Sequence, residues 1–201
     1  MANLNIIKLA PDSWHTVKNG RLYWSPNFIA SNEADELFEL LRNQIEWRKD
    51  KITLFGKTMP IPRLQCWYGD SPYKYSNITM QPEPWLPHLL ELKQRCESVA
   101  NSRFNSALAN LYRNGQDSNG WHSDNEPELG TNPVIASLSF GETRRFHLKH
   151  KITKEKITFD LPSGSLLIMA GEMQKFWLHT LPKTKVNTGA RLNLTFRNLL
   201  S

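Results

Sequence analysis

Asn110-Leu-Tyr-Arg-Asn-Gly-Gln-Asp-Ser-Asn-Gly-Trp-His-Ser-Asp-Asn-Glu126 joins a strand-forming run to a His-x-Asp motif. Alternate side chains of an extended segment share a face, so His122 and Asp124 are expected to point the same way. An imidazole and a carboxylate from one strand end, with one distant histidine, make the facial triad that binds iron(II) and leaves coordination positions open. We expect His179 to be the third ligand. The alternative is that His122-x-Asp124 is a surface turn.

The chain after this stretch is mostly strand-forming. Turn residues such as Pro162-Ser-Gly164 separate short strand candidates at regular spacing, which favours a β-sandwich or double-sheet barrel over βαβ units. The candidate strands are Asn105 to Tyr112, Val134 to Phe140, Arg144 to His150, Ile157 to Leu161, Ser165 to Met169, Phe176 to His179 and Ala190 to Leu199. We therefore predict an α+β fold that is mainly β.

Two helices are predicted ahead of these strands. Ser31 is the expected N-cap of the first, whose apolar residues Ala34, Leu37, Phe38, Leu41 and Ile45 share one face. The second runs from about Pro87 to Ala100 and has a stripe of Leu89, Leu92, Cys96 and Val99. Between the helices, Ile52 to Phe55 is expected to turn at Gly56-Lys57, and Leu64 to Tyr68 to return as a strand.

The last candidate strand has two different faces. Arg191, Asn193, Thr195 and Arg197 alternate with Leu192, Leu194 and Phe196. If the polar face points inward, each guanidinium requires an acid, because a buried unpaired charge is costly. A dicarboxylate cosubstrate would supply one acid to each arginine. The alternative is a polar face in solvent, with both arginines hydrated.

Composition limits the class of protein. With 201 residues and 39% hydrophobic content, we expect one compact domain, and two cysteines indicate a reducing compartment rather than a disulfide scaffold. The 25 basic and 19 acidic residues give a net charge of +6, which suits a polyanionic partner. No apolar run is long enough for a membrane span or a signal peptide, so we expect a soluble, unsecreted protein without membrane contact.

Several motifs together resemble the AlkB family of iron(II)- and 2-oxoglutarate-dependent dioxygenases. They are Asn110-x-Tyr112, His122-x-Asp124, His179 and Arg191-x-Asn193-x-Thr195-x-Arg197. Three further stretches are similar to the animal members that repair alkylated bases: Pro62 to Asp70, Ile135 to Gly141 and Arg191 to Arg197. The resemblance runs from about residue 20 to the C-terminus.

The resemblance implies a double-stranded β-helix, or jelly-roll, with Fe(II), 2-oxoglutarate and O2 as cofactor and cosubstrates. It divides the single domain, residues 1–201, into an N-terminal extension and nucleotide-recognition lid (1–103) and a jelly-roll catalytic core (104–201). Arg197 and Asn110 would lie near the metal-binding end of 2-oxoglutarate, and Arg191 with Tyr112 would hold the far carboxylate. Asn193 and Thr195 would be the remaining residues that bind 2-oxoglutarate.

The implied reaction is removal of N-methyl groups from bases such as 1-methyladenine and 3-methylcytosine in single- or double-stranded DNA, releasing formaldehyde, succinate and CO2. RNA or protein as substrate, or a binding module without turnover, remain alternatives. The resemblance makes His122 one wall of the base pocket, with Tyr75 or Trp67 as the opposite wall, although Trp67 is equally expected in the core. Asn125 and Glu126 would contact the edge of the base, or else only solvate the loop. Lys57, Arg63 and Tyr73 would contact phosphates. Phe55, beside Gly56, would enter the duplex as a wedge, or else fold back onto the core.

We expect a monomer, located in the cytoplasm if the source is bacterial and in the nucleus if it is eukaryotic.

Overall fold

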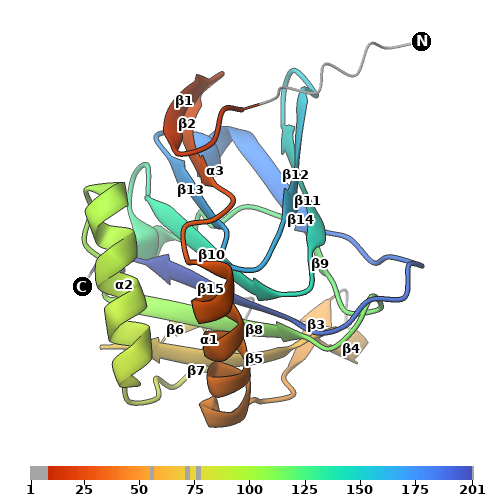
Figure 1. Ribbon diagram of the computed structural model, residues 1–201. Coiled ribbons are helices and arrows are strands. Elements are labelled where there is room, and N and C mark those ends of the chain that lie inside the picture. The colour runs from red at the N-terminus through yellow and green to blue at the C-terminus, as the bar shows by residue number, and fades with distance from the viewer. Residues whose placement is uncertain (1–8, 55–56, 71–72, 76–77, 201) are drawn as a thin grey trace.

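The computed structural model describes residues 9–54, 57–70, 73–75 and 78–200, and most of its strands form two antiparallel sheets (Figure 1). The larger sheet has seven strands in the order β1-β2-β13-β10-β15-β8-β5, and the smaller has four in the order β12-β11-β14-β9. The larger sheet contains β1 (Ser13–Val17), β2 (Gly20–Ser25), β5 (Leu64–Gly69), β8 (Ser106–Tyr112), β10 (Ile135–Gly141), β13 (Leu166–Ala170) and β15 (Arg191–Arg197). The smaller sheet contains β9 (Asn119–His122), β11 (Arg144–His150), β12 (Lys156–Leu161) and β14 (Trp177–Leu181). The two sheets make the predicted jelly-roll core.

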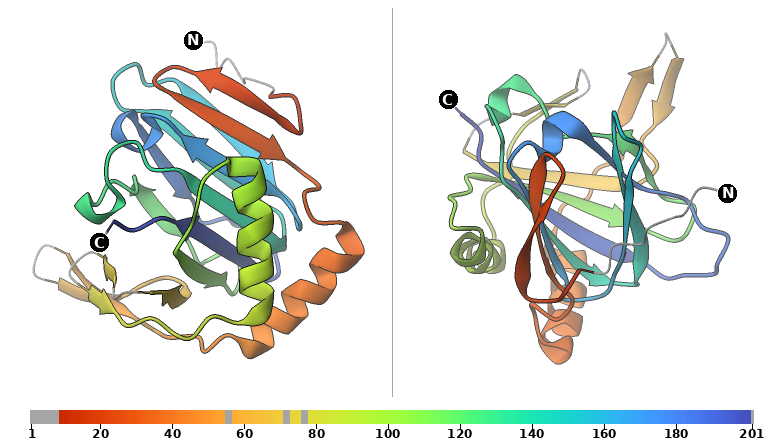
Figure 2. Two further views of the ribbon diagram at one scale, coloured as in Figure 1. Left: turned by 90° about the vertical axis from the view of Figure 1, so that its left-hand side faces the viewer. Right: turned by 90° about the horizontal axis from the view of Figure 1, so that it is seen from above.

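Two helices cover the outer face of the larger sheet (Figures 1 and 2). Helix α1 spans Ser31–Gln44 and α2 spans Pro87–Ala100, which confirms both predicted helices. The prediction that Ser31 caps α1 is wrong. The N-cap is Ala30, whose carbonyl oxygen accepts the first helical hydrogen bond from the Ala34 amide, so Ser31 is already the first helical residue.

The strand alternation produces two apolar clusters. One lies between the helices and the larger sheet, and Leu192, Leu194 and Phe196 of β15 belong to it. The other lies between the two sheets and includes Leu148 and Trp177 of the smaller sheet. The opposite face of β15 is therefore directed to the space between the sheets, beside the second cluster.

Short elements complete the fold. Strand β3 (Lys51–Leu54) pairs with β4 (Lys57–Pro60), so the chain reverses where a hairpin was predicted, but Lys57 is already in the return strand. The predicted return strand, Leu64 to Tyr68, lies instead in β5 and pairs with β8. Strand β6 (Tyr73–Tyr75) pairs with β7 (Ile78–Met80). A 3-10 turn, η1 (Pro127–Leu129), follows β9, and a short helix, α3 (Met173–Phe176), precedes β14.

Strands from the N-terminal half belong to the larger sheet, because β1, β2 and β5 pair within it. The predicted division between residues 103 and 104 stays a prediction. In the parts of the chain that the structure describes, no helix is long and apolar enough to cross a bilayer.

Candidate active site

A cavity lies between the two sheets, and both sheets contribute to its lining. Its walls include polar residues of β8 and β15 on one side and the histidines of β9 and β14 on the other. The lining residues are Arg63, Leu108, Asn110, Tyr112, Asn119, His122, Asp124, Ser137, Phe146, Met169, His179, Leu181, Arg191, Asn193, Thr195 and Arg197. The structure thus brings the predicted metal and cosubstrate residues to one place.

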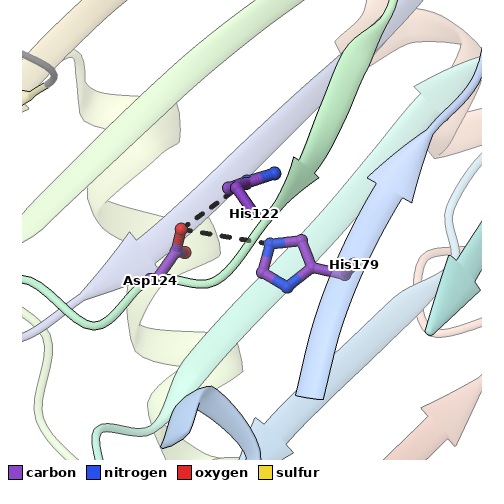
Figure 3. A group of neighbouring side chains, drawn as sticks. All are labelled: His122, Asp124 and His179. Carbon is purple, nitrogen blue, oxygen red and sulfur yellow. Dashed lines mark ion pairs between the residues drawn. The ribbon is translucent and has the colours of Figure 1, made fainter. Parts of the chain in front are cut away.

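The three predicted metal ligands converge at one side of this cavity (Figure 3). His122 ends β9 and pairs across the ladder with His179 of β14, so the two rings lie 4.1 Å apart between centroids. Asp124 follows in the loop, with its Oδ1 atom 3.7 Å from Nε2 of His122 and 3.9 Å from Nε2 of His179. Among the described residues, this is the one group of three His, Cys, Asp or Glu side chains close enough to share a metal ion.

The donor set fits a divalent metal. Oδ1 of Asp124 is buried and accepts no hydrogen bond, although it faces both imidazoles. Nδ1 of His122 donates to the carbonyl oxygen of Gly120, which leaves the Nε2 lone pair directed to the same point. Burial lowers the pKa of His179 to about 3 and also lowers the pKa of His122, so both rings are neutral at neutral pH. Two neutral imidazoles and a carboxylate are the ligands that iron(II) takes in a facial triad.

The polar face of β15 is buried, which rules out the alternative of hydrated arginines. Arg197 donates from Nε and Nη2 to Oδ2 of Asp124, at 3.1 and 2.8 Å. Asp124 therefore supplies the acid that a buried Arg197 requires, and a further contact of Arg197 with 2-oxoglutarate stays a prediction. This ion pair also orients Asp124, since it occupies Oδ2 and leaves Oδ1 facing the histidines.

Arg191 has a different environment at the other end of the strand. Nη2 donates to Oγ of Ser139 at 2.9 Å, and the guanidinium carbon lies 5.4 Å from the Tyr112 ring centroid. No Asp or Glu in the described part of the chain pairs with Arg191, and its buried Nε has no hydrogen-bond partner. Burial lowers the pKa of Arg191 to about 10. This guanidinium fits the far carboxylate of 2-oxoglutarate.

The comparisons with known proteins agree with this chemistry. A family model described as the 2OG-Fe(II) oxygenase superfamily matches residues 21–197. "Alpha-ketoglutarate-dependent dioxygenase alkB homolog 3" of Bos taurus is 44% identical over 189 residues, which are 89% of this chain and 66% of that protein. "DNA oxidative demethylase ALKBH2" of Homo sapiens is 37% identical over 205 residues, which are 95% of this chain and 78% of that protein. The chain belongs to the AlkB family.

A solved structure, "The structure of OsALKBH1", shares the fold of this AlkB-family chain. It superposes with a TM-score of 0.65 at 16% identity and covers 92% of this chain and 100% of its own. The chain spans slightly less than two thirds of the alkB homolog 3 relatives from Bos taurus and Mus musculus, 66% and 64%. Residues 21–197 therefore form a domain of the 2OG-Fe(II) oxygenase superfamily.

Asn110 shows how this AlkB-family site is braced from the side of β5. Its Oδ1 atom accepts hydrogen bonds from Nε of Arg63 at 2.8 Å and from Nε2 of Gln65 at 3.1 Å. Arg63 also donates to the carbonyl oxygen of Ser118 and is only 4% exposed. The prediction that Arg63 meets a phosphate is therefore wrong, because its guanidinium is buried in the cavity wall.

The other predicted substrate residues are spread around the site. Trp67 is 1% exposed and pairs in the ladder with Leu108, a lining residue, so it lies on the cavity side of the larger sheet. Asn125 is exposed and Glu126 is half-buried in the loop after Asp124. Lys57 falls in β4, and Tyr73 and Tyr75 fall in β6. Phe55 and Gly56 lie outside the described residues, and the substrate roles of all eight residues stay predictions.

Several residues that line the cavity or contact its residues were not predicted from the sequence. Ser137 and Ser139 alternate along β10, and this polar period could have placed them on the cavity face. Asn119 was also missed; its Nδ2 lies 3.2 Å from Nε2 of His122 and must move aside when a metal binds. Gln174 donates and accepts beside the site from α3, where no sequence pattern singles it out.

Proposed function

We propose that this dioxygenase removes N-methyl groups from alkylated bases in DNA, with 1-methyladenine and 3-methylcytosine as the expected lesions. The products would be formaldehyde, succinate, CO2 and the repaired base. The observation that carries the proposal is one cavity that contains both the metal triad and a buried guanidinium without an acid, Arg191. The names of two groups of relatives, an alkB homolog and a DNA oxidative demethylase, support the substrate class.

The position of each residue in the cavity indicates its role. His122, Asp124 and His179 would hold the metal, and Arg191 beside Tyr112 would bind the distal carboxylate of 2-oxoglutarate in the orientation that β15 dictates. Arg197 keeps Asp124 ionised and correctly rotated. Bound iron and 2-oxoglutarate supply the oxidation of the methyl group by O2. The apolar cluster between the sheets excludes water from one side of the site.

The substrate base must leave its stack to reach this cavity. The His122 side chain is 22% exposed, so the metal side of the cavity is accessible at this histidine. We propose that the base lies against His122, with Trp67 or Tyr75 as the second wall and Asn125 and Glu126 at its edge. The net charge of +6 favours a polyanionic substrate and predicts salt-sensitive binding.

The test is incubation of the protein with iron(II), 2-oxoglutarate and an oligonucleotide containing 1-methyladenine, followed by mass spectrometry of the methyl loss. Asp124→Ala is the matched inactive control. Parallel reactions use the same lesion in DNA duplex, single-stranded DNA and RNA, and a methylated peptide. Methyl loss only from RNA or peptide would overturn DNA as the substrate, and absence of 2-oxoglutarate decarboxylation would overturn catalysis.

A variant of Phe55 tests how the protein acts on duplex DNA. If Phe55 enters the stack where the flipped base has left, Phe55→Ala should lower activity on duplex much more than on single strands, because only a duplex needs the gap filled. Equal losses on both substrates would make Phe55 a packing residue.

A further inference from the structure

The loop that carries Asp124 is not held by a β ladder. Strand β9 lies at the edge of the smaller sheet, and its last paired residue is His122, opposite His179. The next regular element, η1, begins at Pro127. Asp124 therefore stands in a connection of four residues, 123–126, between two short elements. A metal ligand on such a connection needs side chains from elsewhere to fix its position.

Gln174 provides one of these contacts. Its Oε1 atom accepts a hydrogen bond from the backbone amide of Asp124 at 2.9 Å, and the Gln174 side chain is only 1% exposed. Its Nε2 group donates to the sulfur of Met169 at 3.6 Å, which sets the orientation of the amide. Gln174 lies in α3, which runs directly into β14 and so into His179. One short segment therefore delivers one metal ligand and holds the main chain of another.

Lys151 provides a second contact from the end of β11. Its Nζ atom donates to Oγ of Ser123 at 3.2 Å and to the carbonyl oxygens of Gln174 and Lys175 at 3.1 and 2.8 Å. The ammonium thus joins the residue before Asp124 to the segment that contains Gln174. Lys151 itself does not line the cavity.

We propose that Gln174 and Lys151 are positioning residues for the metal site, and that they set the location of Asp124 relative to the two histidines. Arg197 fixes the carboxylate through Oδ2, and Gln174 fixes the backbone amide of the same residue. Together they leave Oδ1 a single direction, toward Nε2 of His122 and of His179. The inference rests on the proposed metal-dependent function and assigns roles outside the ligands themselves.

The test is metal binding by the purified full chain, measured without turnover. Co(II) is titrated as the probe, and its visible absorption bands report both affinity and coordination geometry. Gln174→Met keeps the side-chain length but removes the acceptor for the Asp124 amide. We expect 10- to 100-fold weaker Co(II) binding, a typical loss for an outer partner of a metal ligand, together with altered absorption bands. Gln174→Glu keeps an acceptor oxygen and should restore most of the affinity and the wild-type bands.

Lys151→Met provides an independent variant, with Lys149→Met as its matched control. In the part of the chain that the structure describes, the Lys149 side chain makes no hydrogen bond or ion pair, and it lies two residues away. We expect Lys151→Met to weaken Co(II) binding and Lys149→Met to leave it unchanged. Circular dichroism at the titration temperature checks that each variant is folded.

The outcomes separate the two claims. Failure of the wild-type chain to bind Co(II) would overturn the metal site and with it the proposed function. Tight wild-type binding with unchanged affinity and bands in Gln174→Met and Lys151→Met would overturn only the positioning roles. Equal losses in Gln174→Met and Gln174→Glu would make Gln174 a packing residue, and Lys151→Met alone would then decide whether the loop is held from β11.

Discussion

The two ends of β15 contain the same residue in opposite electrostatic situations. Arg191 and Arg197 are 2% and 3% exposed and lie on the same face of one strand. Arg197 pairs with Asp124, and its positive charge outweighs the effect of burial and lowers the pKa of that carboxyl. Arg191 pairs with no acid among the described residues, and burial lowers its own pKa. A buried arginine that the fold already neutralises is part of the scaffold, whereas one that the fold leaves without an acid is a receptor for an anion from outside.

The largest expected effect tests the metal end as a whole. His179→Ala should abolish turnover and strongly weaken metal binding, because two remaining ligands no longer form a facial triad. The fold should survive, since His179 is one side chain in a ladder whose backbone pairs remain. Methyl release and Co(II) titration measure the effect, and full activity at micromolar iron would remove His179 from the metal site.

The stability of the metal-free protein tests the contrast between the arginines directly. Arg197→Met should destabilise the fold by about 3 to 5 kcal/mol, because it leaves the Asp124 carboxylate buried without its partner. Arg191→Met should be neutral or stabilising, because it removes a buried charge that has no acid. Urea unfolding without metal or 2-oxoglutarate measures both. Equal destabilisation by the two substitutions would break the comparison.

For 2-oxoglutarate affinity, in contrast to stability, Arg191 should matter more than Arg197. Arg191→Lys keeps the charge but loses the bidentate fork, so 2-oxoglutarate binding should weaken by about 2 to 3 kcal/mol. Arg145→Lys, at an exposed ion pair with Asp160, is the matched control. Calorimetric titration of 2-oxoglutarate measures the change. An unchanged affinity would mean that the far carboxylate binds elsewhere.

The smallest expected effect is a pH dependence at the Arg197 end. Burial would raise the pKa of Asp124, but the Arg197 charge lowers it below the value in the unfolded chain. A depressed folded pKa contributes stability above the unfolded value near 3.9 and loses it as the pH falls toward the folded value. Unfolding midpoints measured from pH 6 down to pH 3 should therefore fall.

The contribution of Asp124 is isolated by subtracting the pH dependence of Arg197→Met from that of the wild type. The pKa values of Glu97 and Asp117 are also lowered, against the opposing effect of burial: backbone and Lys93 hydrogen bonds lower that of Glu97, and Arg113 lowers that of Asp117. Both groups are the same in wild type and in Arg197→Met, so the difference between the two curves belongs to Asp124. A slope that does not become shallower in Arg197→Met would assign the acid sensitivity to other carboxylates.

The sequence predicted what local periodicity encodes. The alternation of β15 placed Arg191 and Leu192 on opposite faces of the strand, and the apolar stripe predicted α2 with its boundaries. Both patterns depend on neighbours within a few residues, where side-chain direction follows from backbone geometry. The His-x-Asp spacing likewise placed His122 beside Asp124.

Contacts between distant segments were not predictable in this way. Arg197 and Asp124 are 73 residues apart, and nothing in either motif shows that one neutralises the other. The Gln174 contact with the Asp124 amide spans 50 residues. Arg63 was expected to meet a phosphate, but Asn110 and Ser118 give its guanidinium buried acceptors. These relations depend on how the sheets face each other, which strand patterns alone do not specify.

Because His122 and His179 belong to two paired strands, a metal ion bound to both affects how firmly these strands are held together. Strand β9 is four residues long and pairs on one side only, with an irregular register toward β14. An ion bound by both histidines cross-links the two strands at the point where their ladder ends, so it opposes local opening of β9. Amide hydrogen exchange in this strand should then slow as iron occupancy rises. Removal of the ion would remove this cross-link, so metal occupancy would stabilise the strand that positions His122 as well as complete the site.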